Sequence, residues 1–121
     1  MDLSLYIRNL ERESFAPGAT IVTRGDVGDA MYVIVEGEVD VAYDEERSVC
    51  LGAGESFGEM ALIEDRPRSA TVTAVADVTL TPINQGTFFV LVHETPYFAL
   101  EVMRSLSDRL RRANQMHTPE G

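Results

Sequence analysis

The 121-residue sequence predicts a small antiparallel β-roll with a short helix before it and two helices after it. Short β-prone runs separated by turn residues follow one another from about residue 20 to residue 83, which is typical of sandwiches and barrels. Apolar residues take up helical spacing after residue 86. The length suits one domain with its own core rather than two. We therefore expect one domain over residues 1–121, with a helix at 1–13, the roll at 14–84 and the last helices at 85–116.

The first third of the chain begins with apolar residues at helical spacing, which are Leu3, Tyr6, Ile7 and Leu10. We expect this short amphipathic helix to pack against the domain. Pro17 and Gly18 mark a turn. Strands are expected at residues 20–23, 31–35, 39–43 and 48–51, with a charged, solvated tip at 44–47. Because Gly37 lies between the second and third of these runs, the pattern predicts that they form a hairpin.

The last third begins with two more strands, at residues 71–74 and 78–83. A helix follows around residues 88–92, with Thr87 as its expected cap. Thr95 and Pro96 are a typical start for the next helix. Its apolar face runs to about Met116 and comprises Ala99, Val102, Met103, Leu106, Leu110 and Ala113.

Composition disfavours several classes of partner and location. The formal charge is −10 and all ten basic residues are arginine, so the chain should repel nucleic acid and anionic membrane surfaces. The single cysteine, Cys50, permits no internal disulfide, which suits a reducing compartment. No apolar run approaches the ~18 residues of a membrane helix, and the N-terminus has no run of signal-peptide length. We expect a soluble, cytoplasmic protein without a membrane span.

The central stretch, residues 57–72, carries the chemistry. Gly58 and Glu59 resemble a turn into a helix, and Arg68 follows in a polar loop. Free N–H groups at a helix start and a nearby arginine together favour an anion. A carboxylate such as Glu59 repels an anion. Its presence beside an anion site makes sense only if it accepts a hydrogen bond from a hydroxyl of the same ligand. A molecule with a phosphate next to a sugar hydroxyl would use both residues.

This stretch, FGEMALIEDRPRSATV, resembles the phosphate-binding cassette of the cyclic nucleotide-binding domain family, roughly F-G-E-aliphatic-A-L, a spacer, then P-R-A/S-A-T-V. Upstream, residues 25–29, 31–34 and 36–39 resemble the family's G-D-x-G-D, Y-V-I and x-G-x-V pieces. The resemblance covers about residues 15–110. It implies a mainly β fold, an eight-stranded antiparallel β-roll of jelly-roll type with flanking helices, and a hinge between the roll and the last helix.

The resemblance also implies a role for each cassette residue. Arg68 would hold the cyclic phosphate with its two-pronged guanidinium, and Glu59 would accept from the ribose 2′-hydroxyl. Further contacts with sugar and phosphate would come from Gly58, Met60 and Ala61, which present backbone groups, and from the small residues Ser69 and Ala70. Four more positions are expected in the base pocket or its lid: Val41, Leu62, Arg109 and Asn114.

Ser69 leaves the ligand open between cAMP and cGMP, with cAMP favoured because serine is closer to the pattern of bacterial cAMP receptors. A threonine there would resemble the cGMP-preferring pattern. The resemblance also allows a homodimer through the last helix, and it implies an effector protein or effector domain that the sequence does not reveal. About ten residues follow Leu110, too few for a helix-turn-helix that would bind DNA.

Arg68 and Glu59 also have simpler structural interpretations. Arg68 could be a surface arginine paired with Glu64 or Asp65, and Glu59 could be an ordinary carboxylate at a helix start. An enzyme is disfavoured because the two histidines, at positions 93 and 117, lack neighbouring ligands and no nucleophile–base pair is apparent. We therefore expect no catalytic residue, metal or cofactor. The function predicted is a non-catalytic cyclic nucleotide sensor whose C-terminal helices move on binding; the alternative is a ligand-free β-roll that acts as a protein–protein interaction module.

Overall fold

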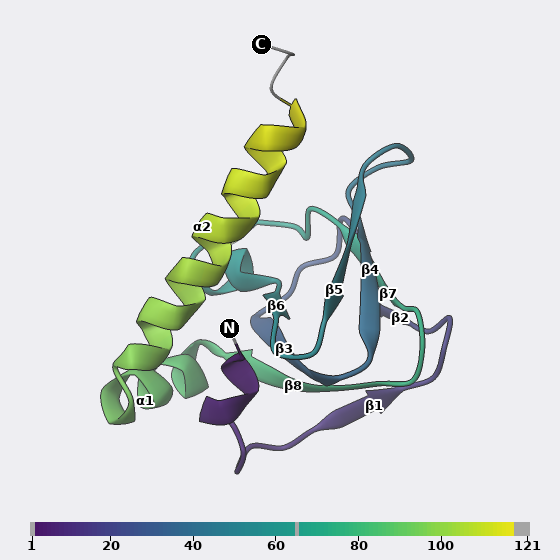
Figure 1. Cartoon of the computed structure of the whole chain (residues 1–121). Coiled ribbons are helices and arrows are strands. Elements are labelled where there is room, and N and C mark those ends of the chain that lie inside the picture. The colour runs from purple at the N-terminus through teal and green to yellow at the C-terminus, as the bar shows by residue number, and fades with distance from the viewer. Residues whose placement is uncertain (1, 65, 118–121) are drawn as a thin grey trace.

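The structure is a computed structural model that describes residues 2–64 and 66–117. These residues form eight strands in two four-stranded antiparallel sheets, ordered β1-β8-β3-β6 and β2-β7-β4-β5 (Figure 1). The strands are β1 (Glu13–Phe15), β2 (Thr20–Val22), β3 (Ala30–Glu36), β4 (Glu38–Ala42), β5 (Ser48–Gly52), β6 (Ser56–Phe57), β7 (Thr71–Ala74) and β8 (Val78–Asn84). The expected mainly β fold of eight strands with flanking helices is confirmed. The two-residue strand β6 was not predicted.

The two sheets enclose the first core. Side chains alternate in β4, where Val39 and Val41 face inward between more exposed residues. Strands β3 and β8 are buried on both faces, so Ile34 and Leu80 point into the roll. The opposite face of the same two strands supports the helices.

The predicted hairpin around Gly37 is wrong. β3 pairs with β6 and β8, whereas β4 pairs with β5 and β7, so the two strands belong to different sheets. Gly37 does form the turn, with φ at +93°, and a β-carbon there would lie 2.3 Å from the carbonyl oxygen of Asp77. Only glycine fits this left-handed turn without strain. The turn therefore carries the chain from one sheet to the other.

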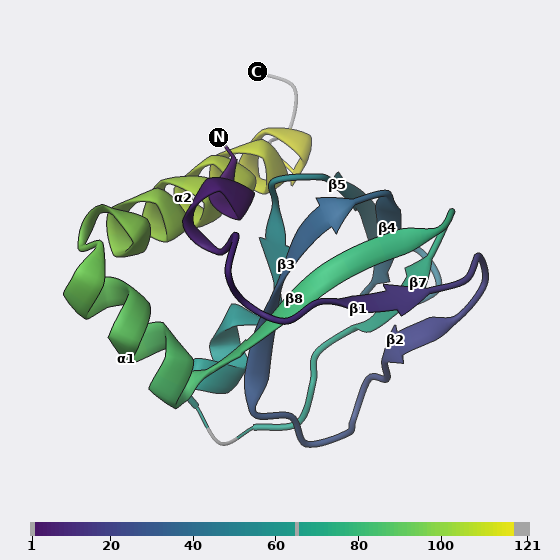
Figure 2. The same ribbon diagram turned by 90° about the horizontal axis from the view of Figure 1, so that it is seen from below.

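The N-terminal helix is shorter than expected. It is a single 3₁₀ turn, η1 (Leu3–Tyr6), capped by the Asp2 carboxylate, which accepts from the Ser4 N–H at 2.9 Å. Leu3 and Ile7 are buried as the apolar spacing predicted. The chain then straightens and adds β1 to the edge of the sheet beside β8 (Figure 2). Residues 7–12 form neither helix nor strand, and only the last residue of the expected helix, Glu13, pairs with β8.

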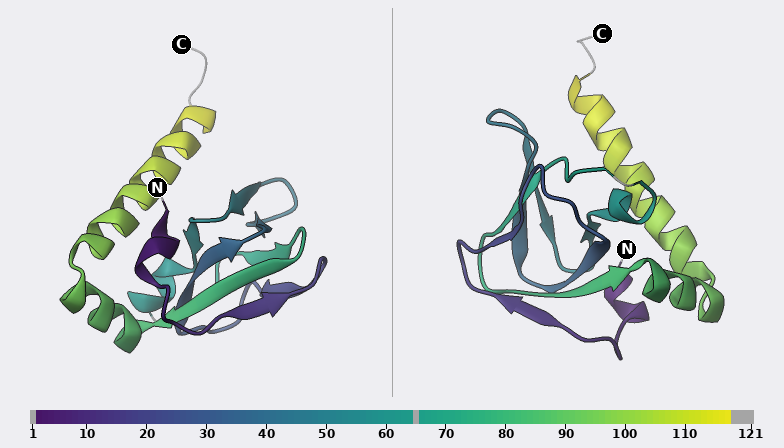
Figure 3. Two further views of the ribbon diagram at one scale, coloured as in Figure 1. Left: turned by 60° about the horizontal axis from the view of Figure 1, so that its bottom comes forward. Right: turned by 180° about the vertical axis from the view of Figure 1, so that it is seen from behind.

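Two helices follow the roll, α1 (Gln85–Glu94) and α2 (Tyr97–His117). The cap of α1 is Asn84, whose side chain accepts from the Thr87 N–H at 2.9 Å, so the prediction of Thr87 as the cap is wrong. α2 lies along one side of the roll, and η1 contacts both α2 and β3 (Figure 3). Within the described residues, no helix is long and apolar enough to span a membrane.

A second core joins the helices to the roll. Phe98 at the start of α2 is fully buried, and its ring packs edge-on against Tyr6 and Phe88 at centroid distances of 5.6 and 5.8 Å. The buried residues of this core are Leu3, Ile7, Met31, Val33, Ile83, Leu91, Phe98 and Val102. The first half of α2 is therefore held by apolar packing. Its second half lies over the central stretch of the sequence.

Candidate ligand-binding site

A cavity of about 530 Å³ lies between the roll, the segment 57–70 and the second half of α2. Its roll wall is apolar and comprises Val22, Val41, Leu51, Phe57 and Val72. α2 contributes an opposite apolar wall with Leu106, Leu110 and Ala113. Charged groups gather along the segment 57–70, so the cavity has an apolar part and a charged part. This division suits a ligand that joins an apolar ring system to an anion.

Gly58 shapes the entrance to the short helix η2 (Glu59–Leu62). Its φ of +80° is left-handed, and an added β-carbon would lie 2.7 Å from Nη1 of Arg68. A side chain at this position would be strained and would displace the guanidinium. The local sequence thus forms the helical turn that was predicted and brings its start beside the arginine. The N–H of Ala61 is already used, since it donates to the Gly58 carbonyl oxygen at 3.1 Å.

Arg68 is held by backbone carbonyls. Its Nη2 donates to the Ala30 oxygen at 2.9 Å and its Nη1 approaches the Gly58 oxygen at 3.4 Å. The guanidinium carbon lies 5.8 Å from the Tyr32 ring centroid. A β-carbon on Gly28 would come within 2.3 Å of the guanidinium, so the glycine leaves room for it. Arg68 has five N–H groups, and those not held by carbonyls remain for a ligand.

The simpler interpretation of Arg68 was a surface arginine paired with Glu64 or Asp65. The structure does not show the first of these two pairs. Glu64 approaches Arg66, at 3.8 Å, rather than Arg68. The other predicted partner, Asp65, lies outside the described residues. Among residues 2–64 and 66–117, no carboxylate pairs with Arg68. A half-buried cation with no carboxylate partner in the described part of the chain, in a protein of net charge −10, favours an anionic ligand.

Glu59 lies across the same cavity and is buried, with 7% of its surface exposed. Its Oε2 accepts from the Ser56 hydroxyl at 2.5 Å and lies 3.8 Å from Nη1 of Arg109. Arg109 also donates through Nη2 to the Ser56 carbonyl oxygen at 2.6 Å. These contacts attach the second half of α2 to β6 and to the start of η2.

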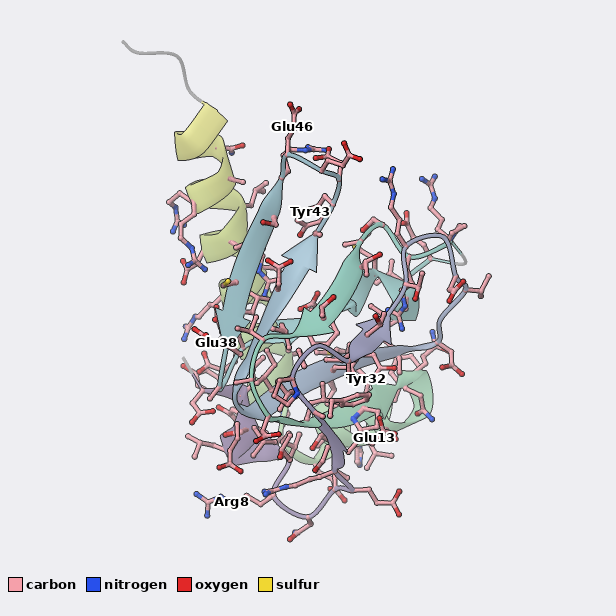
Figure 4. All side chains as sticks on the ribbon, turned by 90° about the vertical axis from the view of Figure 1, so that its right-hand side faces the viewer. Arg8, Glu13, Tyr32, Glu38, Tyr43 and Glu46 are labelled. Atoms are coloured by element: carbon pink, nitrogen blue, oxygen red, sulfur yellow. The ribbon has the colours of Figure 1, made fainter. Side chains whose placement is uncertain are left out.

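Two tyrosine side chains, Tyr43 and Tyr32, lie at different places around the site. Tyr43 follows β4 directly, lines the cavity, and lies just below the hairpin tip that carries Glu46 (Figure 4). Tyr32 lies lower in the roll, beside Arg68. Burial raises the pKa of the Tyr32 hydroxyl above its ordinary value of 10.0, while Arg68 acts in the opposite direction. The hydroxyl therefore stays protonated at neutral pH.

Most of the predicted site residues line one cavity. They are Val41, Gly58, Glu59, Met60, Ala61, Arg68, Ser69, Ala70 and Arg109. Leu62 does not line it and packs instead against the second core, which corrects its expected place in the pocket wall. Asn114 is exposed on α2 and is likewise absent from the lining.

The sequence interpretation missed other residues of the site. The apolar lining of Val22, Leu51 and Val72 comes from predicted strands, and their alternation could have identified them. Ser56 gave no such signal, because its contact with Glu59 depends on the sharp turn between β6 and η2.

Comparison with known proteins identifies the family. The family profile described as the cyclic nucleotide-binding domain matches residues 12–95. The chain belongs to this family. It is 42% identical over 103 residues to a cyclic nucleotide-gated potassium channel of Rhizobium etli, covering 85% of this chain and 29% of the channel. It is 36% identical over 115 residues to the cAMP-dependent protein kinase regulatory subunit of Candida albicans, covering 87% of this chain and 25% of that subunit.

A solved structure gives the same result for the fold. The structure titled "A cyclic-GMP-dependent signalling pathway regulates bacterial phytopathogenesis" superimposes with a TM-score of 0.78 at 31% identity, covering 91% of each chain. The chain spans less than a third of the length of each of these two relatives. In this family the domain is regulatory rather than catalytic.

Proposed function

We propose that the chain is a non-catalytic cyclic nucleotide sensor that binds cAMP in the cavity between the cassette and α2. One observation carries this: Arg68, without a carboxylate partner among the described residues, and Glu59 line the same cavity from a short segment. The guanidinium would hold the cyclic phosphate with the N–H groups that Ala30 and Gly58 leave free. The left-handed turn at Gly58 lets the phosphate approach the backbone of Glu59 and Met60 closely.

The sugar and the base would occupy the rest of the cavity. Glu59 would accept from the ribose 2′-hydroxyl, which explains a carboxylate so close to an anion site. The base would lie between the apolar wall of the roll and that of α2. Ser69 is exposed at the cavity and could donate to the phosphate or to a guanine amine. One relative is the regulatory subunit of a cAMP-dependent protein kinase, whereas the similar solved structure belongs to a cyclic-GMP-dependent signalling pathway. We therefore keep cGMP as the alternative ligand.

α2 would act as the lid and as the output. Leu106, Leu110 and Ala113 form one wall of the cavity, and Leu110 is 63% exposed, so a base would cover apolar surface that is now in water. Ligand binding would then favour one position of the C-terminal helices. Deleting the residues after Leu106 should weaken nucleotide binding severalfold, because it removes Leu110 and Ala113 from this wall together with Arg109. Unchanged affinity in that variant would rule out the lid.

The function is tested by calorimetric titration of cAMP and cGMP into the wild type and into Arg68→Ala. Loss of the charge-assisted contacts should cost about 2–4 kcal/mol, which is roughly 30- to 1,000-fold in affinity. Arg47→Ala is the matched control, since Arg47 has the same charge but lies at the exposed hairpin tip, paired with Asp44. Binding of either nucleotide that collapses in Arg68→Ala and survives in Arg47→Ala supports the sensor. Absence of heat and of a thermal shift with both nucleotides refutes it.

That last result would favour the alternative, a ligand-free protein–protein interaction module. Away from the cavity, α2 offers exposed apolar residues for a partner, at 38% for Leu100 and 58% for Met103. Their spacing of three residues puts them on one side of the helix, so a second copy of α2 is the partner we would test first, by light scattering. An effector protein or effector domain remains part of the proposal. We place the sensor in the cytoplasm, where the exposed free thiol of Cys50 would stay reduced.

A further inference from the structure

We propose that Ser56 is a positioning residue that sets the ribose selectivity of the site by fixing the Glu59 carboxylate. This inference rests on the proposed function, because it concerns how Glu59 receives a nucleotide sugar. Ser56 belongs to β6, the two-residue strand that precedes the cassette turn. Its side chain is fully buried and does not line the cavity. It therefore acts on a ligand only through another residue.

The geometry shows which residue that is. The Ser56 hydroxyl lies 2.5 Å from Oε2 of Glu59. An ionised carboxylate can only accept, so the hydroxyl is the donor. The Ser56 backbone is held as well, since the residue lies opposite Val33 in the β3–β6 pair and its carbonyl oxygen accepts from Arg109 at 2.6 Å. A hydrogen bond from a residue whose backbone is held in this way restricts the rotamers of the carboxylate.

The two oxygens of the Glu59 carboxylate therefore have different roles. Both contacts of Glu59 within the described residues, from Ser56 and from Arg109, go to Oε2. Oε1 keeps its lone pairs for a ligand hydroxyl. Because the serine is neutral, it orients the carboxylate without cancelling its charge, which leaves Oε1 a strong acceptor. A freely rotating carboxylate would present either oxygen and would lose part of its preference for a ribose hydroxyl to conformational entropy.

The test compares cAMP with 2′-deoxy-cAMP, which lacks only the hydroxyl that Glu59 would accept from. We expect the wild type to prefer cAMP by about tenfold or more, the effect of one hydrogen bond to a charged group. Ser56→Ala should reduce this preference to about threefold or less, mainly by weakening cAMP binding, while 2′-deoxy-cAMP binds as before. Ser48→Ala, a serine exposed at the end of β5, is the matched control and should keep the full preference.

Each outcome decides. Equal weakening of both nucleotides by Ser56→Ala would show a merely structural role and overturn the inference, as would an unchanged preference. A wild type that binds both nucleotides equally would overturn it too, while leaving the anion-binding function intact. A wild type that binds neither of these nucleotides, nor cGMP, would refute the proposed function itself. If Ser56→Ala does not fold by circular dichroism, Ser56→Cys, with similar volume and a weak donor, provides the same comparison.

Discussion

Arg109 is predicted to hold the second half of α2 against the cassette, and Arg109→Ala should destabilise the protein by about 2 kcal/mol. Its bond to the Ser56 carbonyl, at 2.6 Å, comes from a charged donor whose side chain is 18% exposed. Such bonds contribute about 1.5–3 kcal/mol. The pair with Glu59 at 3.8 Å adds little, because its distance is long and part of the charge stays solvated.

Urea denaturation followed by circular dichroism measures this change. With a slope of about 2 kcal/mol per molar urea, a loss of about 2 kcal/mol moves the midpoint down by about 1 M. Arg111→Ala is the control, because Arg111 lies on the same helix and its variant changes the charge identically. Its side chain is 62% exposed and pairs with Asp108 at 2.9 Å. An exposed pair of this kind should contribute less than about 0.5 kcal/mol.

Hydrogen exchange locates the effect. Amides in the last turns of α2 should exchange faster in Arg109→Ala, whereas amides around Phe98, in the second core, should be unchanged. If Arg109→Ala and Arg111→Ala shift the midpoint equally, Arg109 does not anchor the helix and the reasoning from its contacts is refuted.

Two further predictions concern stability elsewhere in the chain. Thr81→Val should raise stability by about 1 kcal/mol, since the Thr81 hydroxyl is fully buried in β8 without a hydrogen-bond partner among the described residues; thermal unfolding measures this. At the β4–β5 tip, the N–H of Glu46 and the side chain and N–H of Arg47 hold the pKa of Asp44 below its ordinary value of 3.8. A carboxyl with a lowered pKa stabilises the folded state above its unfolded pKa, and this contribution disappears as the pH falls through the folded pKa. The stability difference between wild type and Asp44→Ala should therefore be full at pH 7 and shrink below about pH 4.

Opposite results would contradict each argument. A lower melting temperature for Thr81→Val would mean that the hydroxyl has a partner, for example a bound water, that its removal leaves unsatisfied. A stability difference for Asp44→Ala that persists unchanged at the lowest accessible pH would mean that the tip is stabilised by something other than the ionised carboxylate.

Local signals in the sequence predicted most elements of the fold. Short β-prone runs identified β2, β3, β4, β5, β7 and β8, and the change to helical spacing identified α1 and α2. The signals failed where pairing is decided by distant residues. Gly37 was correctly predicted as a turn, yet nothing local shows that the strands on its two sides choose partners in different sheets. The helix expected over residues 1–13 is shorter in the structure, ending at Tyr6, and the expected helix overlaps β1 only at Glu13, which pairs with β8.

The site shows the same division. Arg68 and Glu59 were predicted from one continuous motif, and the structure brings them to one cavity because the motif itself forms the turn. Leu62 was misplaced because the 3₁₀ geometry of η2 directs it toward the second core rather than the cavity. Ser56 could not be predicted, since its importance comes from a bond across a turn and a second bond from α2, 53 positions away.

The two different attachments of α2 have a mechanical consequence. The helix has 21 residues and so measures about 31 Å, at about 1.5 Å per residue. Phe98, near one end, is held by non-directional apolar packing and would be the pivot of a moving helix. Arg109 lies about 16 Å along the axis from that pivot, and the helix continues to about 28 Å. Any tilt about Phe98 that shifts Arg109 by about 1 Å shifts the end of the helix by about 1.7 Å. If α2 moves on ligand binding as proposed, a rigid lever of this kind would turn a small change beside Glu59 into a larger displacement at the far end of the helix.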